Sequence, residues 1–349
     1  MLDYRAAAKQ IADGNHKPVY VCLGIERYLI DQFIQYIVNK FILEENKDFA
    51  VSQYDLREIP IQACIEDAET LPFMAEKKIV IGNHASLLTA AREKQKAEHD
   101  LNRLADYLEE PSPFTIMILA VEADKLDERK KVVKLLKKQE AVVSFPEMDA
   151  NTLRSWVLKQ ARKLNCEMDE AAADALIMNA GTNLQHLVQE LEKLSLYAGE
   201  ERMITSGMIE QLTARTVEQN IFLLVDEIVK QNVSRALSIF RELLSRREEP
   251  IKILMLIARQ FRIIMQVKEL SSMGYTNRQI AGQIGQHPYA VKVASDQAKN
   301  YSIKQLQWMI DKLAETDYQM KTGRIDKILA IELAVLELVH MHDSFRQYV

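Results

Sequence analysis

The chain has 349 residues, of which 48% are hydrophobic and 27% charged, and its formal net charge is −5. This length and composition are typical of a globular protein with two or three domains. Nonspecific affinity for DNA comes from neutralising phosphates with basic side chains. The negative net charge therefore argues against a protein whose main function is to bind DNA by itself. A negative net charge is still compatible with a local basic surface.

Cysteine usage and the absence of long apolar runs exclude further classes. Cys22, Cys64 and Cys166 are isolated, so neither a disulfide framework nor a zinc site is indicated. The N-terminus lacks a signal-peptide pattern, and no apolar run approaches the ~20 residues that a membrane span requires. No catalytic Ser/His/Asp or Cys/His constellation stands out. We expect a cytoplasmic protein without membrane segment, metal, cofactor or catalytic residues.

The first 145 residues alternate between strand and helix patterns, which predicts an α/β domain with a parallel sheet over residues 1–145. Near-continuous apolar runs such as Ile116–Leu119 are typical of strands covered on both faces. The expected strands are Val19–Leu23, Ala50–Tyr54, Lys78–Ile81, Thr115–Val121 and Val142–Phe145. The expected helices lie near Arg27–Phe41, Ile61–Ala68, Lys94–Leu108 and Glu128–Lys138.

The first strand leads into a helix through the turn Gly24-Ile25-Glu26-Arg27, where a nucleotide-binding domain carries its phosphate loop. A phosphate cradle needs several glycines, a lysine and a hydroxyl group, and no Gly-Lys pair occurs in the chain. Glu26 would repel phosphate at the helix N-terminus. Glu122 and Asp124 lie where an ATPase would hold Mg²⁺ but have no nucleotide to serve. The pattern predicts an ATPase-like fold without ATPase chemistry, and hence a mechanical or adaptor role.

From Pro146 onward the strand signals stop and helical patterns take over. Residues 146–215 are expected to form a three-helix module, and residues 216–349 an all-α domain. The expected helices of this last domain are Phe222–Lys230, Val233–Ser245, Ile251–Ser272, Asn277–Ile284, Tyr289–Lys299, Ile303–Met320 and Ile325–His342.

Leu71-Pro72-Phe73 lies between an expected helix and the strand Lys78–Ile81. Pro72 blocks helix continuation and keeps Leu71 extended, so two large apolar side chains can project from a short loop. One interpretation packs both into the domain core, and the spacing alone favours it. The other is an exposed hydrophobic plug for a partner's pocket.

Basic residues cluster in two places. The run Lys125–Lys138 has the pattern of a helix with a solvated basic face, and contact with DNA is the more weakly indicated alternative. Arg259 and Arg262 share one side of a long helix, where a salt-bridged surface is favoured somewhat over contact with DNA or another subunit.

The segment Thr276–Ala298 has helix-turn-helix spacing, in which Tyr289, Lys292 and Gln297 would face a DNA groove. An ordinary corner between two helices is the favoured interpretation, because the chain is acidic. His287 has no second ligand nearby, so a metal role is not indicated.

The order of several short motifs along nearly the whole chain resembles the delta subunits of bacterial DNA polymerase III, the clamp-loader subunits that open the sliding clamp. Each motif alone is weak, but their succession is specific. The motifs are Val19–Gly24 with Glu26 and Tyr28–Ile30, Leu71–Phe73 before Lys77–Ile81, Lys125–Asp127 with Arg129, Leu191–Leu194 with Leu196 and Tyr197, Glu249–Pro250, Ala258–Arg262, and His287–Lys292.

The resemblance implies an AAA+-like α/β domain over residues 1–145 with a degenerate phosphate loop, a small helical lid over 146–215 and a helical collar for oligomerisation over 216–349. It makes Leu71 and Phe73 the expected clamp-binding residues and gives Met74 no assigned role. The chain lacks the four-cysteine zinc module of related loader subunits, which agrees with delta.

The implied partners are the sliding clamp (beta), the ATPase subunits tau/gamma, delta-prime and primer-template DNA. Arg259, Arg262 and Lys292 are candidates for contact with DNA or another subunit. The implied function is noncatalytic: partner subunits bind ATP, and this chain opens the clamp ring during replication, in the cytoplasm at the replisome. The alternatives are a regulator that reads DNA through Thr276–Ala298, and an ATPase with an unrecognised phosphate loop.

Overall fold

A computed structural model describes residues 1–73, 75–90 and 96–341. The chain divides into two compact units, Met1–Glu147 and Met148–Val349, each described here by itself.

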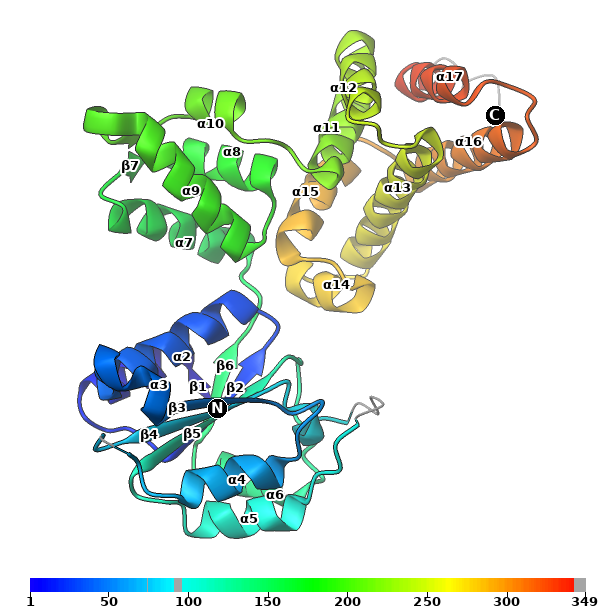
Figure 1. The fold of residues 1–349 in the computed structure, drawn as a ribbon. Helices are drawn as coiled ribbons and strands as arrows, with labels where there is room; N and C mark the ends of the chain where they lie inside the picture. Colours follow the sequence, from blue (N-terminus) through cyan, green and yellow to red (C-terminus); the bar gives the residue numbers. More distant parts are fainter. Residues whose placement is uncertain (74, 91–95, 342–349) are drawn as a thin grey trace. The chain divides into compact units, whose positions relative to one another are not determined.

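The first unit is built on a six-stranded sheet whose strand order is β1–β6–β2–β5–β4–β3, and every pairing is parallel (Figure 1). The order places β2 and β5 at the centre and β3 at one edge. The strands are β1 (Leu2–Asp3), β2 (Val19–Gly24), β3 (Val51–Asp55), β4 (Lys78–Asn83), β5 (Thr115–Val121) and β6 (Val142–Phe145).

Helices cover both faces of this sheet. One face carries α1 and α2, and the other carries α4, α5 and α6 (Figure 1). The helices are α1 (Tyr4–Ala12), α2 (Arg27–Phe41), α3 (Lys47–Ala50), α4 (Ile61–Glu69), α5 (Leu101–Glu109) and α6 (Lys131–Lys138), with short 3₁₀ turns at η1 (Glu44–Asn46) and η2 (Ser86–Leu88).

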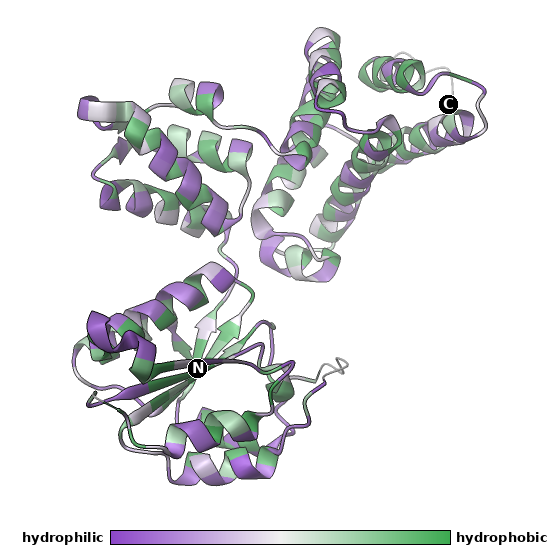
Figure 2. Ribbon diagram, in the orientation of Figure 1, coloured by the Kyte–Doolittle hydropathy of each residue, from purple (hydrophilic) through white to green (hydrophobic). Residues whose placement is uncertain are grey.

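The sequence of the central strands explains this two-sided cover. All seven residues of β5 are buried, and the strands are hydrophobic between helices with polar outer surfaces (Figure 2). In register, Met117 lies beside Val19 and Val80, and all three pack against the helices of one face. The predicted fold class is confirmed as a parallel α/β domain followed by helical regions, and its AAA+-like character stays a prediction.

Two details of the first unit differ from the sequence predictions. The helix expected over Lys94–Leu108 begins at Leu101, because the Asp100 side chain accepts hydrogen bonds from the backbone N–H groups of Asn102 and Arg103 and caps the helix there. Residues 91–95 lie outside the described part. The two-residue strand β1 was not predicted, since it forms only by pairing with β6.

The first part of the second unit, over residues 148–215, contains four α-helices and a two-stranded parallel ladder. The prediction of three helices was therefore wrong by one, because α10 (Ser206–Leu212) was missed. The prediction that strands stop after Pro146 was also wrong, although the two strands have only two residues each. The elements are α7 (Ala150–Lys163), β7 (Glu167–Met168), α8 (Glu170–Ala180), α9 (Leu184–Ala198), η3 (Gly199–Glu201), β8 (Met203–Ile204) and α10 (Ser206–Leu212).

The described residues from Thr216 onward are helical with a shared apolar core. The long helix α13 contributes Ile253, Ile257, Phe261 and Ile264 to that core, at the spacing of one helix face. The helices are α11 (Val217–Val229), α12 (Val233–Ser245), α13 (Pro250–Ser272), α14 (Asn277–Ile284), α15 (Pro288–Ala298), α16 (Ile303–Lys321) and α17 (Lys327–Val339). The separation of the second unit into a lid and a collar stays a prediction.

Candidate functional site

The hydrophobic loop between α4 and β4 lies on the surface. The exposed fraction is 77% for Leu71 and 65% for Phe73. Pro72 between them is half-buried, and Met74 lies outside the described residues. The core-packing interpretation, which the spacing favoured, is therefore wrong for these two side chains. The loop therefore exposes a leucine and an aromatic ring to solvent, with one proline between them in the chain.

The base of this loop is fixed by a buried lysine. Lys78 is 7% exposed, and its ammonium group donates hydrogen bonds to the Asp67 carboxylate, to the Asp67 backbone carbonyl at 3.0 Å and to Thr70 Oγ1 at 2.8 Å. Thr115 Oγ1 donates to the Ala68 carbonyl at 2.7 Å. These bonds tie the C-terminal end of α4 to β4 and β5. The loop that follows α4 therefore starts and ends on rigid elements.

A second aromatic ring contacts this loop. Phe49 of α3 lies edge-on to Phe73, with 6.1 Å between ring centroids and an interplanar angle of 70°. Val51 of β3 pairs with Ile79 of β4 in parallel register, so the residues that precede the two strands meet at the same end of the sheet. Sequence reasoning missed Phe49 because it belongs to no motif and because the sequence does not fix which strands are neighbours.

The opposite, carboxyl end of the sheet is where a doubly wound fold binds nucleotide. Here the first turn passes so close to β6 that a side chain at Gly24 would place its Cβ atom 2.0 Å from the Phe145 carbonyl oxygen. Burial, and after it like-charge repulsion from Glu147, raises the pKa of the Glu26 carboxyl to about 7. Burial, and then Asp124, also raises the pKa of Glu147. Acidic side chains at this turn disfavour a bound phosphate.

Arg27 occupies the position that a nucleotide-binding protein gives to phosphate contacts. Its guanidinium donates to Glu122 Oε1 at 2.9 Å and to Asn83 Oδ1 at 2.8 Å, and pairs with Asp31 at 2.9 Å. His84 Nδ1 lies 3.1 Å from the same Glu122 oxygen. The network joins the start of α2 to the ends of β4 and β5. Glu122, suggested by sequence as a Mg²⁺ position, is thus engaged with Arg27.

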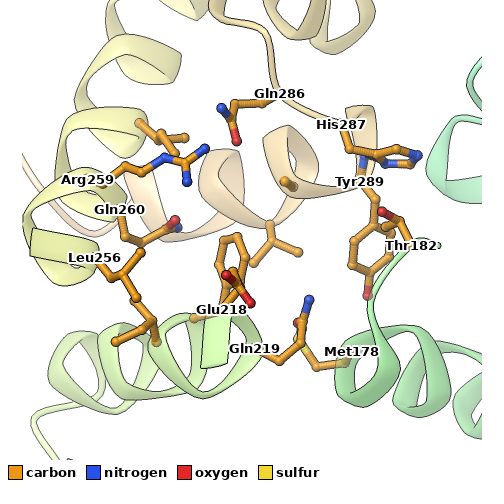
Figure 3. Close-up of a pocket in the computed structure, with 15 residues that line it drawn as sticks. Met178, Thr182, Glu218, Gln219, Leu256, Arg259, Gln260, Gln286, His287 and Tyr289 are labelled. Carbon is orange, nitrogen blue, oxygen red and sulfur yellow. Dashed lines mark hydrogen bonds between the residues drawn. The ribbon is translucent and has the colours of Figure 1, made fainter. Parts of the chain in front are cut away.

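The structure places Arg259 at a cavity of about 160 Å³ in the second unit. Its guanidinium faces Gln286, while Glu218 and Gln219 line the opposite wall (Figure 3). The floor is apolar and includes Phe222. A cavity with an apolar floor and a few polar groups at its rim can accept a small ligand or a side chain of a partner.

The other two basic candidates are not gathered at this cavity. Lys292 lines an adjoining hollow with Asp174 and Asp296, whose carboxylates pair with Arg154 and Lys299, each at 2.6 Å. Arg262 is exposed, and its guanidinium donates to the carbonyl of Ala258 one turn earlier, at 3.3 Å. The three residues therefore do not form one basic patch.

The helix-turn-helix interpretation of Thr276–Ala298 is wrong. Tyr289 is 9% exposed and Gln297 is 3% exposed, so neither side chain is available to a DNA groove. The side-chain amide of Gln260 donates to Gln297 Oε1 at 3.1 Å, which fixes α15 against α13. His287 caps α15 by accepting the backbone N–H of Tyr289 at 3.1 Å, and burial lowers its pKa to about 4. The segment is a packed corner of two helices.

The basic run Lys125–Lys138 is largely engaged within its own domain. Lys130 donates to the carbonyls of Leu87 at 2.7 Å and Thr89 at 2.8 Å, and Arg129 and Lys137 pair with acidic neighbours. The exposed ion pairs of Arg129 and Lys137 fit the interpretation as a solvated basic face, of which Lys131–Lys138 form α6.

Over 1–73, 75–90 and 96–341, no group of three or more His, Cys, Asp or Glu side chains is arranged to hold a metal ion. Within the same ranges, no helix is both long enough and apolar enough to span a membrane.

Comparison with known proteins gives consistent matches. The family model "DNA polymerase III, delta subunit" matches residues 20–146, and the model for the C-terminal domain of that subunit matches residues 218–338. The chain is 38% identical over 336 residues to DNA polymerase III subunit delta of Bacillus subtilis, covering 96% of this chain and 97% of that protein. It is 22% identical to a probable delta subunit of Aquifex aeolicus, over 73% of this chain and 72% of that protein.

A solved structure agrees with these matches. The Bacillus subtilis DNA clamp loader delta protein superposes with a TM-score of 0.74 at 38% sequence identity, covering 97% of this chain and 99% of that one. Because the identity is high and extends across nearly all of both chains, this protein belongs to the family of DNA polymerase III delta subunits.

Proposed function

We propose that this clamp-loader protein binds the sliding clamp through Leu71 and Phe73 and favours the opened ring over the closed one, without hydrolysing ATP itself. The observation that carries the proposal is the exposure of this pair, at 77% and 65%, on a loop with a fixed base. Large apolar side chains in such positions are typical interface anchors. The resemblance to delta subunits makes the clamp the expected partner.

The size of the two side chains suits such a contact. Full burial of each contributes about 1.5–3 kcal/mol relative to leaving it in water. The fixed base matters because a preorganised loop loses less conformational entropy when it binds. Two anchors on a rigid base therefore account for a large share of a moderate-affinity contact.

ATP binding and hydrolysis belong, in this proposal, to the tau/gamma subunits. The support is at the carboxyl end of the sheet, where Arg27 is held by Glu122, Asn83 and Asp31 and where Glu26 crowds the turn. A nucleotide would have to break this network and bring phosphate next to acidic side chains. ATP in the partner subunits shifts the loader to a state in which the Leu71/Phe73 loop reaches the clamp, and hydrolysis there releases it.

The further partners are delta-prime, tau/gamma and primer-template DNA in a hetero-oligomer. The predicted collar offers a surface for neighbouring subunits, since Ile328, Leu329 and Leu333 of α17 are each more than 40% exposed. Arg259, Arg262 and Lys292 stay candidates for contact with DNA or a subunit. The division into α/β domain, lid and collar, and the location in the cytoplasm at the replisome, belong to the same proposal.

The test replaces both anchors. We expect Leu71→Ala with Phe73→Ala to weaken binding to the purified sliding clamp by about 100-fold or more, because the two side chains lose their burial in the complex. Isothermal titration calorimetry of full-length chain with clamp, in the absence of nucleotide, measures the affinity. The unfolding midpoint is expected to stay unchanged, since neither side chain packs in the core.

Leu196→Ala with Tyr197→Ala is the matched control. These residues of α9 are also a neighbouring leucine and aromatic pair, with exposed fractions of 83% and 57%. We expect wild-type clamp affinity for this control. Equal affinity of the Leu71/Phe73 variant and the wild type would remove the loop from the function.

A further inference from the structure

Phe49 is an exposed aromatic side chain that no motif of the sequence explains. Its exposed fraction is 58%, in a short helix of four residues whose other members are Lys47, Asp48 and Ala50. Leaving a phenylalanine in water gives up the stabilisation that burial supplies. Its one aromatic neighbour in the described part of the chain is Phe73, which is itself 65% exposed.

The position of the Phe49 ring is set by rigid neighbours. Ala50, the next residue, is completely buried, and β3 begins directly after it. The backbone N–H of Val51 donates to the carbonyl of Lys47, which closes the turn that carries Phe49. The ring is therefore held at the amino end of the edge strand β3, and Phe73 precedes the neighbouring strand β4 at the same end.

The contact between the two rings has the geometry of an attractive aromatic pair. The centroid separation is 6.1 Å and the interplanar angle 70°, within the edge-to-face range. The pair buries neither ring, because both stay more than half exposed. Its consequence is to restrict the positions of Phe73, which extends from a loop, by contact with a ring on a rigid element.

We propose that Phe49 is a positioning residue of the clamp-binding loop: it holds the Phe73 ring in the orientation in which that ring enters an apolar pocket of the sliding clamp. This inference rests on the proposed function of Leu71 and Phe73. A ring that is already oriented loses less rotational freedom on binding, so the contact raises affinity through preorganisation. Phe49 acts through Phe73, and the effect requires an aromatic ring at both positions.

The experiment is a double-mutant cycle on clamp affinity, measured by calorimetry with full-length chain and purified sliding clamp. We expect Phe49→Ala to weaken binding by about 3- to 10-fold, as the loss of an aromatic pair predicts. Phe49→Leu keeps an apolar side chain but no ring and should weaken binding similarly. Phe49→Tyr keeps the ring and should restore wild-type affinity. In a Phe73→Ala background, Phe49→Ala should have no further effect.

The controls separate this inference from the function on which it rests. Tyr197→Ala removes another aromatic side chain of 57% exposure and should leave clamp affinity unchanged. Wild-type affinity for Phe49→Ala, together with lost binding for Leu71→Ala/Phe73→Ala, would overturn the positioning role and leave the proposed function intact. Equal weakening by Phe49→Ala with and without Phe73 would also overturn it. Unchanged binding in every variant would overturn both.

Discussion

Glu26, at the residue scale, is a carboxyl group whose protonation depends on the fold. Burial, and then like-charge repulsion from Glu147, raises its pKa to about 7. Burial, and then like-charge repulsion from Asp124, raises the pKa of Glu147. Three acidic side chains thus lie close together where an ATPase would bind a polyphosphate. The cost of ionising Glu26 and Glu147 in the folded state makes the stability of this domain depend on pH.

We expect Glu26→Gln to stabilise the protein at pH 8 and to have little effect near pH 4.5. The folded-state pKa is raised, so the carboxyl contributes stability that is present below its unfolded pKa of about 4.3 and is lost as pH rises through about 7. Glutamine mimics the protonated acid at every pH. The expected gain at pH 8 is about 1–3 kcal/mol in the free energy of unfolding, measured by urea titration.

Glu45→Gln is the control for this pH experiment, because Glu45 is an exposed glutamate of η1 in the same unit. It should change stability little at either pH. A gain for Glu26→Gln that is equal at pH 4.5 and pH 8, or no gain at all, would contradict the assignment.

Most secondary structure elements could be predicted from the sequence, because their signals are local. The limits of α2, α12 and α14 match the predictions, and each follows from apolar periodicity ended by turn residues. The strands β1, β7 and β8 were missed because two-residue strands exist only through their partners. The start of α5 was missed because the cap at Asp100 outweighed the upstream helical pattern.

The candidate site was predictable only in part, because its geometry depends on contacts between segments that are distant in the chain. The sequence identified Leu71 and Phe73, but its spacing rules favoured burial, and their exposure is decided by how α4 and β4 pack. Phe49 and the Arg27 network depend on strand order, which brings together segments distant in the chain. The absence of a phosphate loop could be predicted from the sequence, since a phosphate loop is a contiguous motif.

At the element scale, the loop after α4 depends on Lys78. We expect Lys78→Met to lower the free energy of unfolding by about 2–3 kcal/mol, because it leaves the Asp67 carboxylate and Thr70 without their shared donor in a mostly buried place. Chemical denaturation followed by circular dichroism measures this loss.

The neighbouring Lys77→Met supplies the comparison. The Lys77 ammonium donates to the Pro113 carbonyl at 2.8 Å in an exposed position, so we expect a loss below about 1 kcal/mol. Equal losses for the two lysines would show that the buried network does not hold the loop.

At the scale of the whole molecule, we propose that this protein acts by binding and without catalysis. The first unit carries an exposed hydrophobic loop at the amino end of its sheet and a network centred on Arg27 at the carboxyl end. A protein of this kind changes a partner only through its different affinities for the partner's two states. In the proposed function, the clamp ring opens to the extent that Leu71 and Phe73, oriented by Phe49, bind the open form more tightly.

The most direct measurement is clamp opening by this chain alone. A sliding clamp labelled with a fluorophore pair across one subunit interface is titrated with full-length protein in the absence of ATP. The account predicts a saturable loss of energy transfer with wild-type protein, and none with Leu71→Ala/Phe73→Ala at the same concentrations. A ring that stays closed when saturated with wild-type protein, or that opens equally with the double variant, would contradict it.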